Sequence, residues 1–287
     1  MHPFSYSRPA SLAEAVALLA ERGPDARVLA GGTDLIIRLR DGSMAPGLVI
    51  DVKRIPELAP GIRVAGDSLV IGATTVMTDI AAHPVIRRDL AALAEAAAVV
   101  GSVQIRNRAT IGGNLCNASP AADTAPALLV HGAIAIAAGP DGVRRIPVDE
   151  LFVRSGVTTL ARGELVAAVE IPLPVDRIAS AHQRRTRRRG HDLASVTLAC
   201  GVDRAGVARI AYGSVGPRPL LRIDATGALA DPAVSDEAKA VVFETIFADA
   251  SPSARSMRAG PDYRLAMLRV LGRRALAAAL ERLAAGE

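Results

Sequence analysis

The chain has 287 residues, of which half are hydrophobic, 22% are charged and 2% are aromatic, and its formal net charge is +5. This length suffices for two domains. No apolar run approaches the ~20 residues that cross a bilayer, and the first ten residues lack the apolar core of a signal peptide, so we expect a cytoplasmic protein without a transmembrane segment. The only two cysteines, Cys116 and Cys200, exclude a disulfide framework and a four-cysteine iron–sulfur cluster within this chain.

The first part of the chain is expected to form a strand–helix–strand unit. Residues 4–6 mark a short strand, and Ser11 with Glu14 has the spacing of a capping box, which predicts a helix that ends at Gly23. Apolar patterning predicts a strand, a helix and a buried strand at residues 27–30, 33–40 and 48–52. The helix is expected to bury Leu35, Ile36 and Leu39.

The middle of the chain combines helices with antiparallel strands. Residues 62–64 and 69–71 predict a hairpin, and Thr74 or Thr75 is placed to cap a short helix. Pro84 is expected to open a longer alanine-rich helix that runs to residue 100. Further strands are predicted at 134–137, 143–146 and 165–171, before Pro172 and Pro174.

The last part is predicted to be a charge-rich strand pair, at 194–202 and 207–212, followed by two helices that start at Ser235 and Pro261. Strands with interspersed helices and terminal helices favour an α+β fold over a doubly wound α/β sheet.

Residues 110–123 read as a polar loop without an apolar face that would explain it as core. Gly112 and Gly113 allow close approach of a ligand to the backbone, and Asn114, Asn117 and Asp123 supply polar groups. Cys116 lies inside this segment, where a small buried residue is the favoured interpretation.

A second glycine pair, Gly31 and Gly32, follows an apolar run and precedes a helix. The N–H groups at a helix N-terminus suit a phosphate or diphosphate, and dinucleotides carry a diphosphate. Neither segment has the Gly-x-Gly-x-x-Gly spacing of a Rossmann fold, and a single glycine pair is as typical of a tight turn.

The pair of segments resembles a known family. Residues 30–35, Ala-Gly-Gly-Thr-Asp-Leu, with 110–114, Thr-Ile-Gly-Gly-Asn, and 119–123, Ser-Pro-Ala-Ala-Asp, look like the FAD-binding (medium) subunit of molybdenum hydroxylases. That family includes the flavin subunit of carbon monoxide dehydrogenase and the flavin domain of xanthine dehydrogenase. Residues 106–108, 262–264 and 273–276 also resemble its members, so the likeness covers nearly the whole chain.

The resemblance implies a two-part FAD-binding domain of the PCMH (vanillyl-alcohol-oxidase-like) type, followed by a smaller C-terminal α+β domain with an antiparallel sheet and helices. The expected division is 1–174, with subdomains of about 1–56 and 57–174, and 175–287. Carried over residue by residue, the implied FAD contacts are Leu29, Ala30, Gly31, Gly32, Thr33, Asp34, Leu35, Ile105, Ala109, Thr110, Gly112, Gly113, Asn114, Asn117, Asp123, Leu165, Val166 and Arg184.

Individual roles differ within this set. Thr33 and Thr110 are expected to cap helices, to bond a phosphate, or both. Asp34 repels a phosphate, so its carboxylate is expected to cap the helix or orient the loop. Asn114 and Asp123 suit ribityl or ribose hydroxyls. No histidine is placed for covalent attachment, so the FAD is expected to be noncovalent.

Residues 184–189 hold five arginines and leave three interpretations open. A nucleic-acid patch lacks support because aromatic residues are scarce. A solvated strand edge or a subunit contact is the plain alternative. The family implies a third, in which Arg184 approaches the polar edge of the isoalloxazine and favours an anionic reduced flavin.

The resemblance implies an oxidoreductase subunit for electron transfer, with no catalytic residue and no metal of its own. A large molybdenum-cofactor (molybdopterin) subunit and a small [2Fe-2S] subunit are the implied partners, in a dimer of heterotrimers. Quinone, NAD, oxygen or another carrier would accept the electrons. A self-contained flavin oxidoreductase on the same scaffold is the alternative, and it would need its own acid or base.

Overall fold

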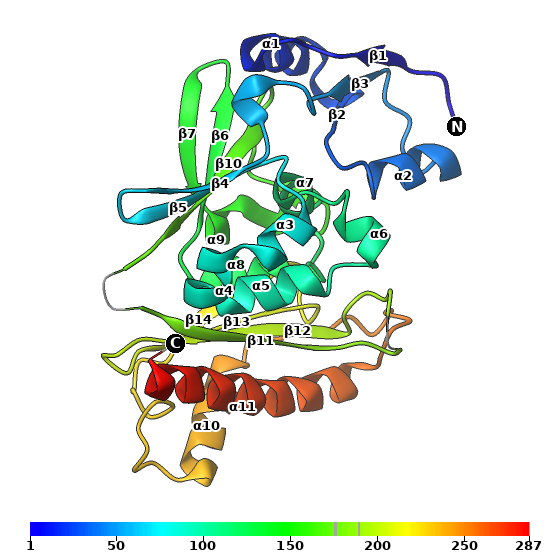
Figure 1. Cartoon of the computed structure of the whole chain (residues 1–287). Coiled ribbons are helices and arrows are strands. Elements are labelled where there is room, and N and C mark those ends of the chain that lie inside the picture. Colours follow the sequence, from blue (N-terminus) through cyan, green and yellow to red (C-terminus); the bar gives the residue numbers. More distant parts are fainter. Residues whose placement is uncertain (175–176, 189, 287) are drawn as a thin grey trace.

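The computed structural model describes residues 1–174, 177–188 and 190–286. Its helices and strands form three sheet-containing parts that follow one another along the molecule (Figure 1). The first part is a parallel three-stranded sheet in the order β1-β3-β2, built from β1 (Ser5–Ser7), α1 (Leu12–Arg22), η1 (Gly23–Asp25), β2 (Ala26–Leu29), α2 (Leu35–Asp41), β3 (Leu48–Asp51) and η2 (Pro56–Leu58).

The predicted N-cap of α1 is confirmed, because Ser11 Oγ accepts a hydrogen bond from the Glu14 N–H at 3.2 Å. The capping box is formed only in part, since Glu14 Oε2 accepts the Ala10 N–H at 2.8 Å rather than the N–H of Ser11. The prediction for α2 is only partly right, because Leu39 is buried while Leu35 and Ile36 stay half-buried.

The central sheet is antiparallel, in the order β4-β5-β10-β6-β7. Its strands are β4 (Ile62–Ala65), β5 (Ser68–Gly72), β6 (Ile134–Gly139), β7 (Gly142–Pro147) and β10 (Leu165–Pro172). The predicted hairpin at 62–71 is therefore confirmed, and β10 joins it to the later pair. The small pair β8 (Phe152–Arg154) and β9 (Val157–Thr158) forms a separate two-stranded sheet.

Short helices accompany the central sheet: α3 (Met77–Ala82), α4 (Pro84–Asp89), α5 (Ala91–Ala98), α6 (Val103–Arg106), α7 (Ile111–Cys116), α8 (Thr124–Val130) and α9 (Val148–Leu151). The single helix expected from 84 to 100 is wrong, because buried Leu90 leaves helical geometry, with φ −133° and ψ 47°. The expected threonine cap is also wrong. Val76 precedes α3, while Thr74 and Thr75 bond the carbonyls of Leu58 and Gly61.

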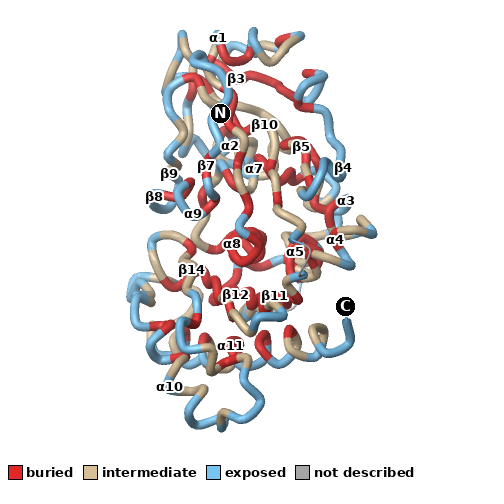
Figure 2. Tube along the Cα trace, turned by 90° about the vertical axis from the view of Figure 1, so that its left-hand side faces the viewer, coloured by how far each residue is buried: buried red, intermediate tan, exposed pale blue. Residues whose placement is uncertain are grey.

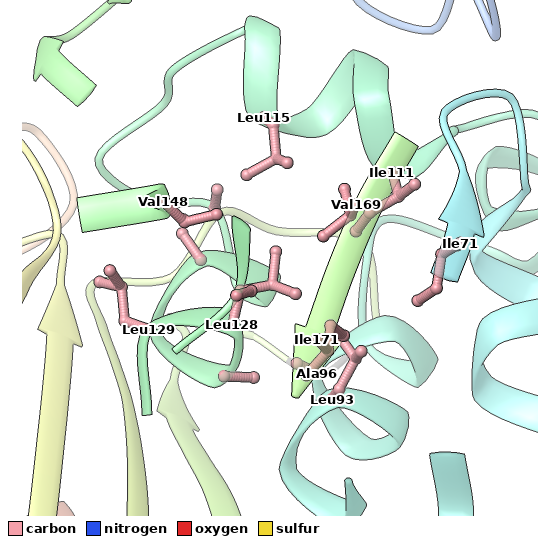
Figure 3. Close-up of a cluster of buried hydrophobic side chains, with 14 of the residues drawn as sticks. Ile71, Leu93, Ala96, Ile111, Leu115, Leu128, Leu129, Val148, Val169 and Ile171 are labelled. Atoms are coloured by element: carbon pink, nitrogen blue, oxygen red, sulfur yellow. The ribbon is translucent and has the colours of Figure 1, made fainter. Parts of the chain in front are cut away.

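One apolar cluster holds these helices to the sheet (Figure 3). Leu93 of α5, Leu128 of α8 and Val169 of β10 are fully buried in it. Each such side chain contributes about 1.5–3 kcal/mol by leaving water. Every residue of α8 is buried, as the red tube of Figure 2 shows.

The third part is an antiparallel sheet in the order β11-β12-β13-β14, formed by β11 (Ala179–Arg185), β12 (Val196–Val202), β13 (Ala208–Gly213) and β14 (Leu220–Ile223). Helix α11 (Pro261–Ala285) covers its outer face, and α5 and α8 lie against the inner face (Figures 1 and 2). All seven residues of β12, Val-Thr-Leu-Ala-Cys-Gly-Val, are buried because both faces of the sheet are covered. None of them is charged, so the expectation of a charge-rich strand is wrong there.

Helix α10 (Asp236–Ile246) starts where predicted, because Ser235 Oγ accepts a hydrogen bond from the Ala238 N–H. Gly272 of α11 permits close packing of α10, since a Cβ there would lie 2.9 Å from the Phe243 ring. Among the described residues, no helix has both the length and the apolar character to cross a membrane.

Candidate cofactor-binding site

The two glycine-containing segments meet in the folded chain. A Cβ atom at Gly31 would lie 2.0 Å from the Arg108 carbonyl oxygen and 3.1 Å from the Ala109 Cα atom. Only glycine permits this approach, which sets the turn between β2 and α2 against the residues that lead into α7. Residues almost eighty positions apart therefore border one site.

The first segment offers a row of unused backbone donors. Within the described part of the chain, the N–H groups of residues 31–35 donate no hydrogen bond, and the next N–H, of Ile36, bonds the Gly32 carbonyl at 3.0 Å. Gly32 has a φ of +76°, which favours glycine. Consecutive free N–H groups at a helix N-terminus suit a negatively charged oxygen ligand.

The Asp34 carboxylate does not cap α2, as one of the two expected roles required. Asp34 occupies the N-cap position of α2, but its carboxylate accepts no capping hydrogen bond, and the residue is exposed. Its backbone has helical φ and ψ of −99° and −44°, whereas a capping side chain requires an extended backbone. The prediction of a side-chain cap is therefore wrong. Thr33, beside it, is half-buried.

The second segment is a helix start whose donors are already used. The N–H groups of Ile111 and Gly112 donate to the carbonyls of Thr75 and Ala73, each at 3.0 Å. The Gly113 N–H donates to Thr110 Oγ1 at 3.1 Å, so Thr110 is the N-cap of α7. The N–H groups of residues 111–113 therefore have acceptors within the chain, two of them in the turn at residues 73–75.

The expectation that residues 110–123 lack an apolar face is also wrong. Ile111 and Leu115 are 0% and 1% exposed and belong to the central cluster (Figure 3). Gly112 packs tightly as well, since a Cβ there would lie 2.8 Å from the Ala73 Cβ. Cys116 is exposed at the end of α7, rather than buried as expected.

The polar residues of this segment have partners inside the chain. Asn114 Oδ1 accepts a hydrogen bond from Thr124 Oγ1 at 2.6 Å, which leaves its amide donors for another group. Asp123 is 6% exposed, and its Oδ2 accepts a hydrogen bond from Arg184 Nη1 at 2.6 Å. Asp123 Oδ1 is buried without a hydrogen bond among the described residues and lies 3.6 Å from His182 Nε2.

Arg184 belongs to β11, so the C-terminal sheet contributes to the same region. Its guanidinium also donates to the carbonyl of Val99 at 2.7 Å and to that of Asp192 at 3.3 Å. These three acceptors fix the cation beside Asp123. The other arginines of the run are engaged in part: Arg185 bonds Tyr263 and Arg187 bonds Asp192, and Arg189 lies outside the described residues.

Four further predicted residues lie at the start of β10, on α6 and just before α7. Leu165 and Val166 are buried at the start of β10, where the register of pairing with β6 shifts after Val166. Ile105 lies half-buried on α6, and the carbonyl of buried Ala109 accepts the Met77 N–H at 2.9 Å.

One residue at the site was missed by sequence reasoning. Arg38 of α2 donates from Nη2 to Asn117 Oδ1 at 2.9 Å and so bridges the two segments. An arginine six residues after a glycine pair, in the first turn of a helix, carries no motif that would single it out. Elsewhere, a cavity of about 560 Å³ lies between α4–α5 and β11–α11, and it involves none of the predicted residues.

The folded chain matches known proteins over nearly its whole length. Residues 2–174 match the family described as FAD binding domain in molybdopterin dehydrogenase, and residues 181–279 match the CO dehydrogenase flavoprotein C-terminal domain. The chain belongs to the family of FAD-binding subunits of molybdenum hydroxylases.

This flavin subunit is 35% identical to the carbon monoxide dehydrogenase medium chain of Hydrogenophaga pseudoflava, over 98% of each chain. It is 32% identical to the putative xanthine dehydrogenase FAD-binding subunit of Escherichia coli K12, over 96% of each. A solved Cu,Mo-CO dehydrogenase superposes with a TM-score of 0.91 at 31% identity, covering 98% of this chain and 99% of that one.

The flavin subunit is thus an oxidoreductase subunit that binds FAD, with the predicted α+β architecture. Its residues fit the cofactor. The free N–H groups of 31–35 suit the diphosphate, and a buried carboxylate oxygen of Asp123 without a hydrogen bond among the described residues is an acceptor that a bound hydroxyl could satisfy.

Proposed function

We propose that this subunit carries electrons from [2Fe-2S] clusters of a partner subunit to an external acceptor, while a separate molybdenum subunit oxidises the substrate. Family membership over nearly the whole chain supports the proposal. The row of free N–H groups at residues 31–35 is the single observation that carries it, because it provides an anion-binding element where the family pattern expects FAD.

Bound FAD would supply the exchange between one-electron and two-electron transfer. The protein would bind and orient it and set its electrostatic surroundings. Residues 31–35 would hold the diphosphate through their N–H groups, and Arg184 would place its positive charge at the polar edge of the ring system. The cofactor-binding set is Leu29, Ala30, Gly31, Gly32, Thr33, Asp34, Leu35, Ile105, Ala109, Thr110, Gly112, Gly113, Asn114, Asn117, Asp123, Leu165, Val166 and Arg184.

The proposed domain division is 1–174, with subdomains of about 1–56 and 57–174, and 175–287. Residues 175 and 176, at the division, lie outside the described residues. The proposed assembly joins this chain to a large molybdenum-cofactor subunit and a small [2Fe-2S] subunit, as a dimer of heterotrimers in the cytoplasm.

The test starts from the purified protein with the subunits that accompany it. Denaturation and filtration should release one FAD per chain into the filtrate, because no covalent bond is expected. After rapid mixing with reduced [2Fe-2S] subunit, the flavin absorbance should bleach. Release of FMN, flavin retained on the denatured chain, or oxidation of substrate by this chain alone would each contradict the proposal, and the last would favour a self-contained oxidoreductase.

A further inference from the structure

Arg38 is the side chain that joins the two halves of the cofactor site. It lies in the first turn of α2, just after the free N–H groups of 31–35. Its own N–H makes a helical hydrogen bond to the Asp34 carbonyl at 3.1 Å. Its Nη2 reaches Asn117 Oδ1 at 2.9 Å, at the far end of α7. A side chain that starts in one segment and ends on the other must cross the space between them.

The Arg38 guanidinium has more N–H donors than its single hydrogen bond to Asn117 uses. Arginine has five N–H donors in a planar fork and stays charged at all working pH values. In the described part of the chain, Arg38 makes one side-chain hydrogen bond, to Asn117, and no salt bridge. It is half-buried, so its charge is screened less than that of a fully exposed arginine.

The acidic Asp34 in the first segment would oppose binding of a diphosphate unless a positive charge offsets it. Residues 31–35 present N–H dipoles, but the segment also holds the acidic Asp34. A diphosphate bound there would meet that carboxylate, which opposes binding. An arginine four residues later on the same helical face is placed to offset the repulsion.

We propose that Arg38 is a cofactor-binding residue whose guanidinium pairs with the diphosphate of FAD and closes α2 over α7. This rests on the proposed function, because it requires FAD in this site. Asn117 holds the guanidinium in position before the cofactor arrives. The N–H groups of 31–35, in the turn before α2 and at its first residue, and the Arg38 guanidinium then bind diphosphate oxygens together.

The test measures FAD affinity of the deflavinated complex, by quenching of flavin fluorescence, at low and at high salt. Arg38→Ala should raise the Kd at least tenfold, since charge-assisted hydrogen bonds are among the strong ones, and the loss should shrink at high salt. Arg38→Lys should recover part of the affinity. Arg40→Ala removes an exposed arginine from the same helix and should leave the Kd unchanged.

The variant Asn117→Ala distinguishes a direct role of Arg38 in FAD binding from a purely structural link between α2 and α7. If Arg38 only tied the segments together, Asn117→Ala, Arg38→Ala and the double variant would weaken FAD binding equally. The proposal instead expects Asn117→Ala to weaken FAD binding less than Arg38→Ala does. It also expects a loss of affinity that shrinks at high salt only for the variants in which Arg38 is replaced. Thermal unfolding of each variant without FAD checks that the fold persists.

The outcomes are distinguishable. A parent complex that binds no FAD would overturn the proposed function itself. A parent that binds FAD, with an Arg38→Ala variant whose Kd equals that of Arg40→Ala, would overturn the role of Arg38 alone.

Discussion

Arg184 Nη1 lies 2.6 Å from Asp123 Oδ2 and joins the C-terminal sheet to the glycine-containing segment of the cofactor site. The side chains are 14% and 7% exposed, so water screens this pair little. The carboxylate thus offsets part of the positive charge that we assign to the flavin edge, and the local potential depends on both residues. Removing one partner of such a buried pair leaves the other uncompensated.

Arg184→Ala should lower the reduction potential of the bound flavin, because it removes a cation that favours the reduced anion. A change of 1.4 kcal/mol corresponds to about 30 mV for two electrons, so a shift of tens of millivolts is expected. A redox titration measures it. Arg184→Lys, which keeps the charge, should shift the potential less, and Asp123→Asn should raise it. An unchanged potential in Arg184→Ala would remove Arg184 from the flavin edge.

Gly31→Ala should impair FAD binding while leaving most of the fold intact. Its new Cβ would lie 2.0 Å from the Arg108 carbonyl oxygen, so the two segments must move apart. We expect at least tenfold weaker binding in fluorescence titrations. Gly61→Ala is the matched control, because a Cβ there would meet no atom of the described residues within 4 Å.

Gly113→Val tests the second segment. Gly113 is exposed, and among the described residues a Cβ there would meet Thr110 Oγ1 alone, at 2.9 Å. The added side chain would therefore occupy space that we assign to FAD rather than to core packing. The variant should lose flavin, with near-normal thermal unfolding of the apoprotein. Normal FAD content would contradict the assignment of this segment.

His131 should make stability depend on pH. Burial, and then the positive charge of Arg209, lower the pKa of His131 from 6.5 to about 4. The unfolded chain therefore binds a proton between pH 6.5 and 4 that the folded chain does not. The contribution of neutral His131 to the free energy of unfolding is complete above pH 6.5 and falls by about 3 kcal/mol as the pH drops to 4.

Denaturant unfolding at several pH values measures this loss. The Ser180 hydroxyl lies 2.9 Å from His131 Nε2 and accepts the Ala92 N–H at 3.1 Å, so a neutral ring accepts the hydroxyl proton. His131→Gln should flatten the slope between pH 6.5 and 4, while the exposed His191→Gln should keep it. Parallel slopes for the parent and His131→Gln would refute the role of this histidine.

Neutralising Arg187, Arg188 and Arg189 should leave FAD content unchanged. Arg187 already pairs with Asp192 at 3.1 Å, and Arg188 bonds the His191 carbonyl at 3.2 Å, so surface or subunit contacts are the expected targets. A gel-shift assay of the parent protein should detect no binding to DNA or RNA at physiological salt. Strong, salt-sensitive binding that the triple variant abolishes would instead support a nucleic-acid patch.

Local signals in the sequence were enough for most elements. Ser11 and Ser235 cap their helices where the spacing predicted, because the side chain and its backbone partner lie three residues apart. Strand patterning located the central hairpin. The family pattern in the two glycine segments led to the FAD-binding family, which comparison with known proteins then supported over nearly the whole chain.

Tertiary structure decided which polar groups are free. Both glycine pairs look alike in sequence, yet the carbonyls of Ala73 and Thr75 accept the N–H groups of Gly112 and Ile111, while the N–H groups of residues 31–35 have no acceptor in the described part of the chain. The Arg184–Asp123 pair likewise joins groups sixty-one positions apart. Sequence determines which donors and acceptors exist and their short-range geometry, but packing of distant segments selects their partners, and so only the folded chain shows which of them remain for a cofactor.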